Sequence, residues 1–510
     1  MTGARDPDKS AVGERECPSP PRRLARRLLV ILIALLAVGW SASFLYNHSG
    51  GARLAAARRE AQKLGLTLSY DDFLAKYPPP LEEENAAQFY EAAIATLLYV
   101  GYKPESDYVP IVSRALAGEP EQVDERLARA IRDSRRLDSD PRIPMPDYML
   151  EASAVYVANR AAVIDLIHKG AALPRCRYHL QWDRFNTLLP HLTRVRSMVR
   201  MMAVAARVDA EQNRPHDAAV KIGDMLSLAV STKEDYFCVS SLVEMACVSI
   251  TLTDGLTRAA ARTLLSNDDL LVLQQDLERF DANFSLERTY EGELVMWAGI
   301  SDELVSGRVS LRNFLSTYSD SVNAGSPHKY SRFIYRLPPL LIAGRLKAEE
   351  AIILEHISRH VAHVDEMSRR LPEGEQSDTL VTEAESNDFP IALSGLCWTP
   401  RVPLSAACTR AKLRSAAAAM AALRFRNDHG RLPASLDELV PEYMAEMPVD
   451  PFSGKPLLFR LLDDGLIVYS ISENRTDDAG KGYILGRGTA ADGDDHGFSI
   501  WTGSPEGEKE

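Results

Sequence analysis

The chain has 510 residues, of which 45% are apolar and 25% are charged. This composition is typical of a globular protein, and the length predicts two or three folding units. The formal net charge of −12 argues against a nucleic-acid partner, because phosphate binding requires a clustered basic surface. Six cysteines without a Cys-x-x-Cys pair do not make a disulfide scaffold.

An uncharged apolar stretch near the N-terminus predicts a transmembrane helix. Residues 28–46 read LLVILIALLAVGWSASFLY, and a helix of this length spans about 28 Å, close to the hydrocarbon core of about 30 Å. Four arginines precede it, and Trp40 and Tyr46 lie at its far end, where an aromatic belt is expected. Basic residues after the span weaken the charge asymmetry without reversing it. The positive-inside rule therefore predicts a cytoplasmic N-terminus and lipid contact through residues 28–46.

A cleaved signal peptide is the alternative interpretation of the same stretch. Its strongly apolar part, residues 28–38, is short, and Ser41-Ala42-Ser43 resembles a cleavage site. Both interpretations place the bulk of the chain outside the cytoplasm. Residues 1–27 are then a disordered basic cytoplasmic tail if the span is kept.

Residues 47–371 are predicted to form a helical domain. A helix is expected from near Glu82, because its apolar positions recur on one face. Between residues 188 and 277 one helical pattern follows another, and two of them flank Asn213-Arg214-Pro215. Two amphipathic helices around a short turn predict an antiparallel hairpin. No clean 34-residue period appears, so the fold expected is an irregular array similar to tetratricopeptide repeats.

Two further features of this domain are predicted from local patterns. Ser266 and Asp269 have the spacing of a capping box and predict a helix start. A long helix is expected from about Leu346 to Leu371. The acidic, polar stretch that follows makes residues 372–400 a candidate linker.

The C-terminal part, residues 401–502, is predicted to be a small α+β domain, followed by a tail at 503–510. An Ala-rich helix is expected over residues 405–428, with Gly430 as its stop signal. Ser435 is expected to cap a short helix. Strands are predicted at 457–462, 466–472 and 497–501, the first two joined through Asp463-Asp464-Gly465. The expected fold class is therefore mainly α, with one transmembrane helix and a small C-terminal α+β domain.

The C-terminal domain resembles the globular part of type II secretion major pseudopilins. The similarity lies in LRFRNDHGRLP at 423–433, MPVDPFSGKPL at 447–457, and the Asp-rich stretches at 476–480 and 492–495. It covers about a fifth of the chain. Unlike these subunits, the present chain has no Gly-Phe processing site and no Glu in its span. More than 350 residues also separate the span from this domain, so the chain is not expected to form filaments.

The resemblance implies a calcium ion bound by the acidic loop. By position, its carboxylate ligands would be Asp478, Asp492, Asp494 and Asp495, with Asp477 as an alternate. Calcium takes six to eight hard oxygen ligands, so a loop rich in Asp and Gly suits it. Asp and Gly are also the ordinary residues of exposed loops, so this second interpretation stays open.

Three histidines on the predicted long helix are the only candidates for a catalytic metal. His356, His360 and His363 lie at i, i+4 and i+7, on one side of a helix. Three histidines on one straight helix do not readily converge on an ion, and ordinary packing at the border of the apolar stripe is the alternative. Cys397 and Cys408 could form a disulfide or remain as two buried free thiols. Cys238 and Cys247 are too far apart along one helix to pair.

No motif for nucleophilic, phosphate-binding or zinc-dependent catalysis occurs in the chain. With the resemblance, these observations predict a single-pass protein of a bacterial inner membrane, its bulk in the periplasm. The function expected is non-enzymatic binding of envelope proteins through the helical array and the pseudopilin-like domain. The alternative is an envelope hydrolase or metal-dependent enzyme using the His356, His360 and His363 cluster.

Overall fold

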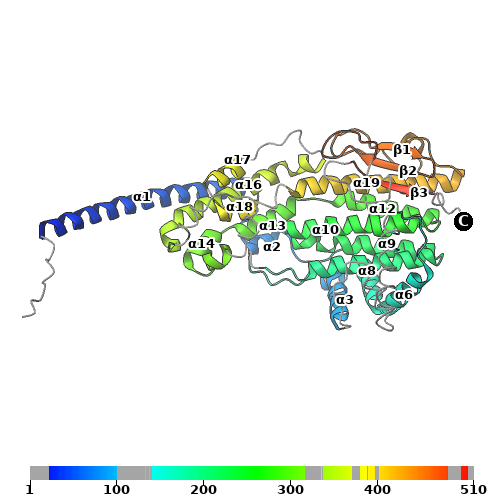
Figure 1. The fold of residues 1–510 in the computed structure, drawn as a ribbon, viewed down its shortest axis with the longest axis horizontal. Coiled ribbons are helices and arrows are strands. Elements are labelled where there is room, and N and C mark those ends of the chain that lie inside the picture. Colours follow the sequence, from blue (N-terminus) through cyan, green and yellow to red (C-terminus); the bar gives the residue numbers. More distant parts are fainter. Residues whose placement is uncertain are drawn as a thin grey trace, which may run out of the picture.

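The computed structural model describes residues 22–99, 133, 137, 140–184, 187–315, 335, 337–369, 379–387, 389–396, 401–480 and 495–502. Within the first helix, side chains are described at positions 27, 30, 31, 33 and 34 and from 48 onward. The described chain is mainly helical, with one small antiparallel sheet near its C-terminal end (Figure 1). The mainly α fold class with a small α+β end is therefore confirmed.

The helices of the N-terminal half are α1 (Arg22–Lys63), α2 (Tyr70–Lys76), α3 (Ala87–Tyr99), α6 (Asp147–Ala158), α7 (Ala161–Ala171), α8 (His191–Glu211), α9 (Pro215–Ala229) and α10 (Cys238–Ile250). They are followed by α11 (Arg258–Ala260), α12 (Asn267–Asn283), α13 (Glu287–Trp297), α14 (Ile300–Ser306), α16 (Ala343–Arg369), α17 (Thr379–Ser386), α18 (Pro390–Leu396) and α19 (Arg401–His429). Short 3₁₀ segments are η1 (Glu82–Glu84), η2 (Val230–Asp235), η5 (Pro339–Ile342) and η6 (Leu436–Leu439), and η3 (Thr251–Thr257) is a π-helix.

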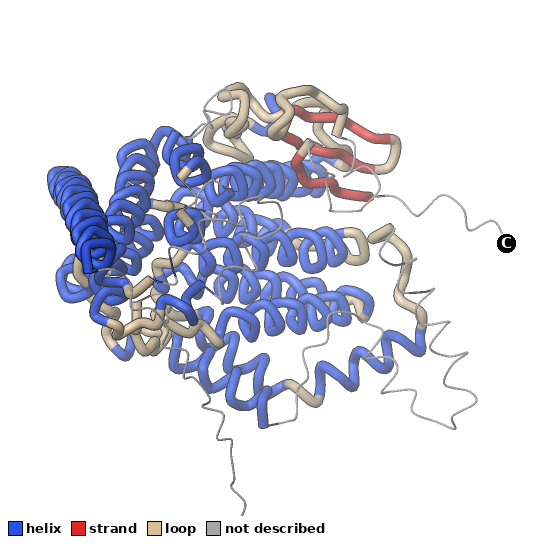
Figure 2. The backbone as a smooth tube through the Cα atoms, turned by 60° about the vertical axis from the view of Figure 1, so that its left-hand side comes forward, coloured by secondary structure: helices blue, strands red, loops and turns tan. Residues whose placement is uncertain are grey.

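The strands are β1 (Leu458–Leu462), β2 (Gly465–Ser470) and β3 (His496–Trp501). They form an antiparallel sheet in the order β1-β2-β3, with Leu458 opposite Tyr469 and Gly465 opposite Trp501. The turn of residues 463–465 closes the hairpin as predicted. One face of the sheet packs on α19, which in turn lies along α12. Figure 2 shows the sheet resting on the stack of helices.

The predicted helices of the central part are confirmed. The two helices that flank residues 213–215 are α8 and α9, which pack against each other as an antiparallel hairpin. Ser266 caps α12 by accepting a hydrogen bond from the Asp269 amide at 3.1 Å. Ser435, in contrast, makes no capping bond, and the segment after it is a single 3₁₀ turn. The capping box predicted there is wrong, because the Ser435 hydroxyl donates to Asp437 Oδ2 and the Glu438 amide donates to the Ser435 carbonyl oxygen.

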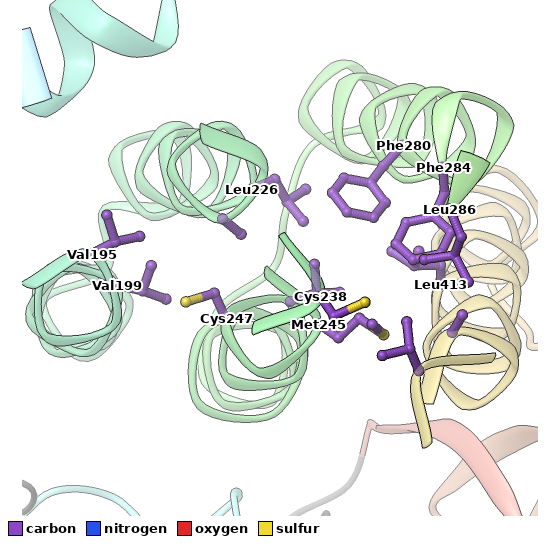
Figure 3. Packing of buried hydrophobic residues seen from close by; sticks show 14 of the residues in the cluster. Val195, Val199, Leu226, Cys238, Met245, Cys247, Phe280, Phe284, Leu286 and Leu413 are labelled. Carbon is purple, nitrogen blue, oxygen red and sulfur yellow. The ribbon is translucent and has the colours of Figure 1, made fainter. Parts of the chain in front are cut away.

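The main hydrophobic cluster of the core extends from Leu54 in α1 to Ile500 in β3, and smaller clusters lie beside it. Helix α10 lies at its centre, between α8 and α9 on one side and α12 and α19 on the other (Figure 3). Among the residues whose side chains the structure describes, which leave out most of residues 28–46, the segment Cys238–Ala260 is the one helix that is long and apolar enough to cross a membrane. More than half of it is buried inside the protein, as expected of a core helix.

The predicted linker, residues 372–400, contains two short helices in its described part. Both α17 and α18 pack against α16. The remaining linker residues lie outside the described ones, and the division into domains stays a prediction.

Helix α1 is continuous from Arg22 to Lys63 and joins the predicted span to the helical body. Its C-terminal part packs against α16, and at their crossing a Cβ atom on Gly50 would collide with the carbonyl oxygen of Gly344. Such close backbone approach requires glycine. Beyond the crossing, Arg58 pairs with Glu350 at 2.7 Å. Because Arg58 and Glu350 each follow their glycine by about two turns, α1 and α16 run in the same direction.

Gly50 and Gly51 provide a matched test of this packing. A Cβ at Gly51 would meet no atom within 4 Å. Replacing a helical glycine by alanine stabilises a helix by about 1 kcal/mol when space is available, whereas overpacking costs about 1–3 kcal/mol. We therefore expect Gly51→Ala to raise the melting temperature and Gly50→Ala to lower it, measured by circular dichroism. Equal shifts in the two variants would contradict the close crossing.

Candidate functional site

The acidic loop predicted to bind calcium lies at one end of the sheet. Asp477 and Asp478 are in the segment that follows β2, and Asp495 directly precedes β3. Because β2 and β3 are antiparallel neighbours, the C-terminal end of β2 and the N-terminal end of β3 lie at the same end of the sheet. Asp492 and Asp494 lie outside the described residues.

Asp495 is the buried centre of this loop. Its Oδ2 accepts hydrogen bonds from the amides of Asp478, at 2.9 Å, and Gly480, at 2.8 Å. Its Oδ1 is buried and has no hydrogen-bond partner among the described residues. A buried carboxylate oxygen without a partner is unfavourable, and a proton or a cation on this atom would remove that penalty.

The surroundings of Asp495 are negatively charged. Burial, with smaller contributions from the charges of Asp478 and Asp477, raises the pKa of the Asp495 carboxyl to about 6. The two amide hydrogen bonds oppose this shift. Nearby, Asp477 accepts a hydrogen bond from the Tyr469 hydroxyl at 3.1 Å, and Asp478 accepts one from the Asn474 amide at 2.8 Å.

The donor set of this loop suits a hard cation, although the described residues do not complete a site. Carboxylate oxygens are the ligands calcium prefers, and the unpartnered Oδ1 of Asp495 is the atom that fits one best. Within the described ranges, no group of three or more His, Cys, Asp or Glu side chains is placed to hold a metal. A complete ligand set would therefore need Asp492 and Asp494.

The three histidines of α16 are in different environments. His356 is fully buried and His363 is exposed. His360 lies between them, with its Nδ1 at 3.0 Å from the carbonyl oxygen of His356. The geometry of these side chains gives the metal-enzyme hypothesis no support.

The buried acidic residues of α16 were not predicted from the sequence. Glu349 and Glu350 are both fully buried. Glu350 accepts hydrogen bonds from the amides of Gly299 and Ser301 at the start of α14, and Glu349 accepts them from the amides of Ile391 and Ala392 at the start of α18. Free amides at helix N-termini bind carboxylates well, so each glutamate joins a short helix to α16. The signal in the sequence was a Glu pair within an apolar helical stripe.

Another buried carboxylate, Asp235, lies where η2 meets α8 and α10. Asp235 Oδ2 is 2.7 Å from His191 Nε2 and accepts a hydrogen bond from Ser240 Oγ at 2.9 Å. His191 is the first residue of α8, and Ser240 lies in the first turn of α10. Both partners share one oxygen of Asp235, whereas a catalytic triad needs the serine bonded to the histidine. This cluster joins the two helices.

The described thiols are free and poorly suited to nucleophilic chemistry. Cys176, Cys238, Cys247 and Cys408 form no disulfide, and Cys397, the proposed partner of Cys408, lies outside the described residues. Burial raises the pKa of Cys247 and of Cys408 to about 12. A reactive cysteine needs a lowered pKa.

No family model, curated protein or solved structure matches the chain. The resemblance of residues 401–502 to pseudopilins therefore stays a prediction.

The raised pKa of Asp495 predicts a specific pH dependence of stability. The ordinary carboxyl pKa is 3.8 and that of folded Asp495 is about 6, so the folded chain holds this proton more tightly than the unfolded chain. Its stabilising contribution is fully present below pH 3.8 and is lost as the pH rises through about 6. We expect Asp495→Asn, measured by thermal unfolding in EDTA, to gain in melting temperature relative to the parent chain across this interval.

The control is Asp463→Asn, an exposed position in the β1–β2 hairpin. It should follow the parent chain at every pH. Parallel curves for the parent chain and Asp495→Asn would show that Asp495 does not titrate as described.

Proposed function

We propose that this chain is a single-pass membrane protein whose bulk lies outside the cytoplasm and binds other envelope proteins without catalysing a reaction. The observation that carries the proposal is that α1 extends far beyond the helical body (Figure 1). In the outer part of α1, Val30, Ile31 and Ile33 are 65%, 55% and 56% exposed. Apolar side chains in this arrangement are stable in lipid and unfavourable in water.

The continuity of α1, which runs as one helix from Arg22 to Lys63, also supports an anchor that stays attached. A signal peptide is removed at a site near residues 41–43, only a few residues before the Gly50 crossing. In the uncleaved interpretation, one uninterrupted helix links membrane and body, so the body would be held at a fixed height above the bilayer. The long helical body then offers its outer helices as interaction surfaces, in the manner of helical-repeat proteins.

The chemistry of the buried polar groups supports a binding role over catalysis. Glu349, Glu350 and Asp235 are occupied by helix N-termini or by neighbouring helices. Burial raises the pKa of the thiols of Cys176, Cys238, Cys247 and Cys408. These groups stabilise the fold, because the three carboxylates hold helices together and burial raises the pKa of the thiols instead of activating them.

The anchor is tested with topology reporters and membrane extraction. A phosphatase that is active only outside the cytoplasm should be active when fused after Glu510 and inactive when fused before residue 22. Leu36→Arg with Val38→Arg, in the middle of residues 28–46, should release the chain from membranes in alkaline carbonate, because each arginine costs about 3 kcal/mol at the centre of a span. Leu264→Arg, at an exposed apolar position in the α11–α12 loop, is the matched control.

The binding role is tested in the same membranes. Crosslinking of the anchored full chain should capture defined envelope proteins, and capture should fail with the double-arginine variant. A reporter after Glu510 that faces the cytoplasm would overturn the proposal. Absence of any crosslinked envelope protein would remove its binding part.

We further propose that the acidic loop binds calcium through Asp478, Asp492, Asp494 and Asp495. When bound, the ion would supply the positive charge that the unpartnered oxygen of Asp495 lacks. Millimolar calcium should raise the melting temperature at pH 7.5, and Asp494→Ala or Asp495→Asn should abolish the rise. The rise should shrink towards pH 5, because a proton competes for Asp495, whose pKa is about 6.

Asp463→Asn should keep the full response to calcium, because this residue lies in the hairpin at the other end of β2. An unchanged melting temperature in millimolar calcium would end the calcium proposal and leave the anchor proposal intact.

A further inference from the structure

An exposed apolar turn lies beside the point where α1 leaves the body. In η5 and just before it, Leu340, Leu341 and Leu337 are 69%, 56% and 41% exposed. Residues 337–344 read LPPLLIAG and contain no charge. Apolar side chains that gather on a surface mark an interaction site more often than scattered ones do.

The position of this turn along the axis of α1 follows from the crossing of α1 and α16. Gly50 touches Gly344, and the two helices run in the same direction into the body. Segments that precede these glycines therefore point back towards the predicted span. Tyr46, the last residue of the span, is four residues before Gly50, or about 6 Å along the α-helix. Leu340 is four residues before Gly344, or roughly 6–8 Å at the rise of α- and 3₁₀-helices.

The turn is also in contact with the anchor helix. η5 packs against α1 and against α14. It continues directly into α16, because Ala343, the first residue of α16, has helical dihedral angles. Leu340 and Tyr46 are therefore at the same level, on neighbouring helices. If residues 28–46 span the bilayer, this level is the boundary between hydrocarbon and headgroups.

The backbone of the turn suits insertion into this boundary. Pro338 and Pro339 have no N–H group that would lose hydration. The amide of Leu341 donates to the carbonyl oxygen of Pro338 at 2.9 Å. The nearest cationic side chain on the C-terminal side, Arg345, points to the Tyr335 hydroxyl at 2.7 Å instead of to solvent. The two prolines, the Leu341 amide and Arg345 would therefore add little to the polar surface that is desolvated when the leucines enter lipid.

We infer that the turn Leu337–Leu341 is a second membrane contact, which inserts its leucines into the bilayer interface beside the anchor. This inference rests on the proposed anchor. A single helix leaves a protein free to tilt about its point of exit, whereas two adjacent contacts restrict the tilt. The turn would thus fix the orientation of the elongated body relative to the membrane.

The inference is tested with spin labels on the full chain in lipid nanodiscs, at one chain per disc. Labels are attached to Leu340→Cys, Ile33→Cys and Leu264→Cys, and the unsubstituted chain gives the background from native thiols. The three positions are all exposed, so the substitutions should leave the melting temperature unchanged. The measurement is the ratio of collisions with oxygen, which partitions into lipid, to collisions with a water-soluble nickel chelate.

We expect a several-fold higher ratio at 340 than at 264, with the highest value at 33. A water-like ratio at 340 together with a lipid-like ratio at 33 would overturn the second contact and keep the anchor. Water-like ratios at 33 and 340 would overturn both. A label at 340 that is shielded from both reagents would indicate a protein partner on the turn and would also overturn the inference.

Discussion

The contact between α1 and α16 is the constraint on which the arrangement of the N-terminal half depends. Two glycine backbones touch at Gly50 and Gly344, and this distance leaves no room for a side chain. Arg53 then bridges Glu355 and Glu383, and Arg58 bridges to Glu350, so the charged groups lie at the edges of the contact. A helix that is held so closely over its C-terminal third cannot pivot, and its N-terminal part is a rigid extension of the body.

Helix α16 also organises the short helices around it. Short helices are unstable alone, because few of their backbone amides find partners. Glu349 and Glu350 satisfy those amides at α18 and α14 and bury their own charge in the process. Burial raises the pKa of Glu349 to about 7, which indicates that the amide and tyrosine hydrogen bonds only partly offset the loss of hydration. The same helix thus joins α1, α14 and α18.

The sheet at the other end of the molecule depends on a different carboxylate. Asp495 holds the chain before β3 against the segment after β2 through two amide hydrogen bonds. Its second oxygen is unpartnered among the described residues and lies near two further aspartates. In the proposed function, a cation would relieve this concentration of charge. The anchor would then position the helical body at the membrane, and the acidic loop would independently stabilise the end of the sheet.

The amino-acid sequence alone determined several of the helices and the hairpin of β1 and β2, but it assigned the residues of α17 and α18 to a linker. Helical periodicity and turn residues are local signals, and they located α8, α9, α12, α16 and α19 to within a few residues. The prediction from the capping pattern failed at Ser435, where the pattern occurs before a single 3₁₀ turn. The apolar stretch of residues 28–46 and the Asp-rich loop were also evident, because composition within one segment defines them.

Only the tertiary structure decided which of these segments meet. Nothing in the spacing of Gly50 or Gly344 indicates that they touch, since they are almost 300 residues apart. Glu349 and Glu350 lie in an apolar stripe, and their role became clear only when the starts of α14 and α18 were placed against them. The exposed leucines of η5 indicate a membrane contact only because the tertiary structure places them beside Tyr46, at the end of the predicted span. Long-range packing is set by the complementary shapes of distant surfaces, and no local pattern encodes it.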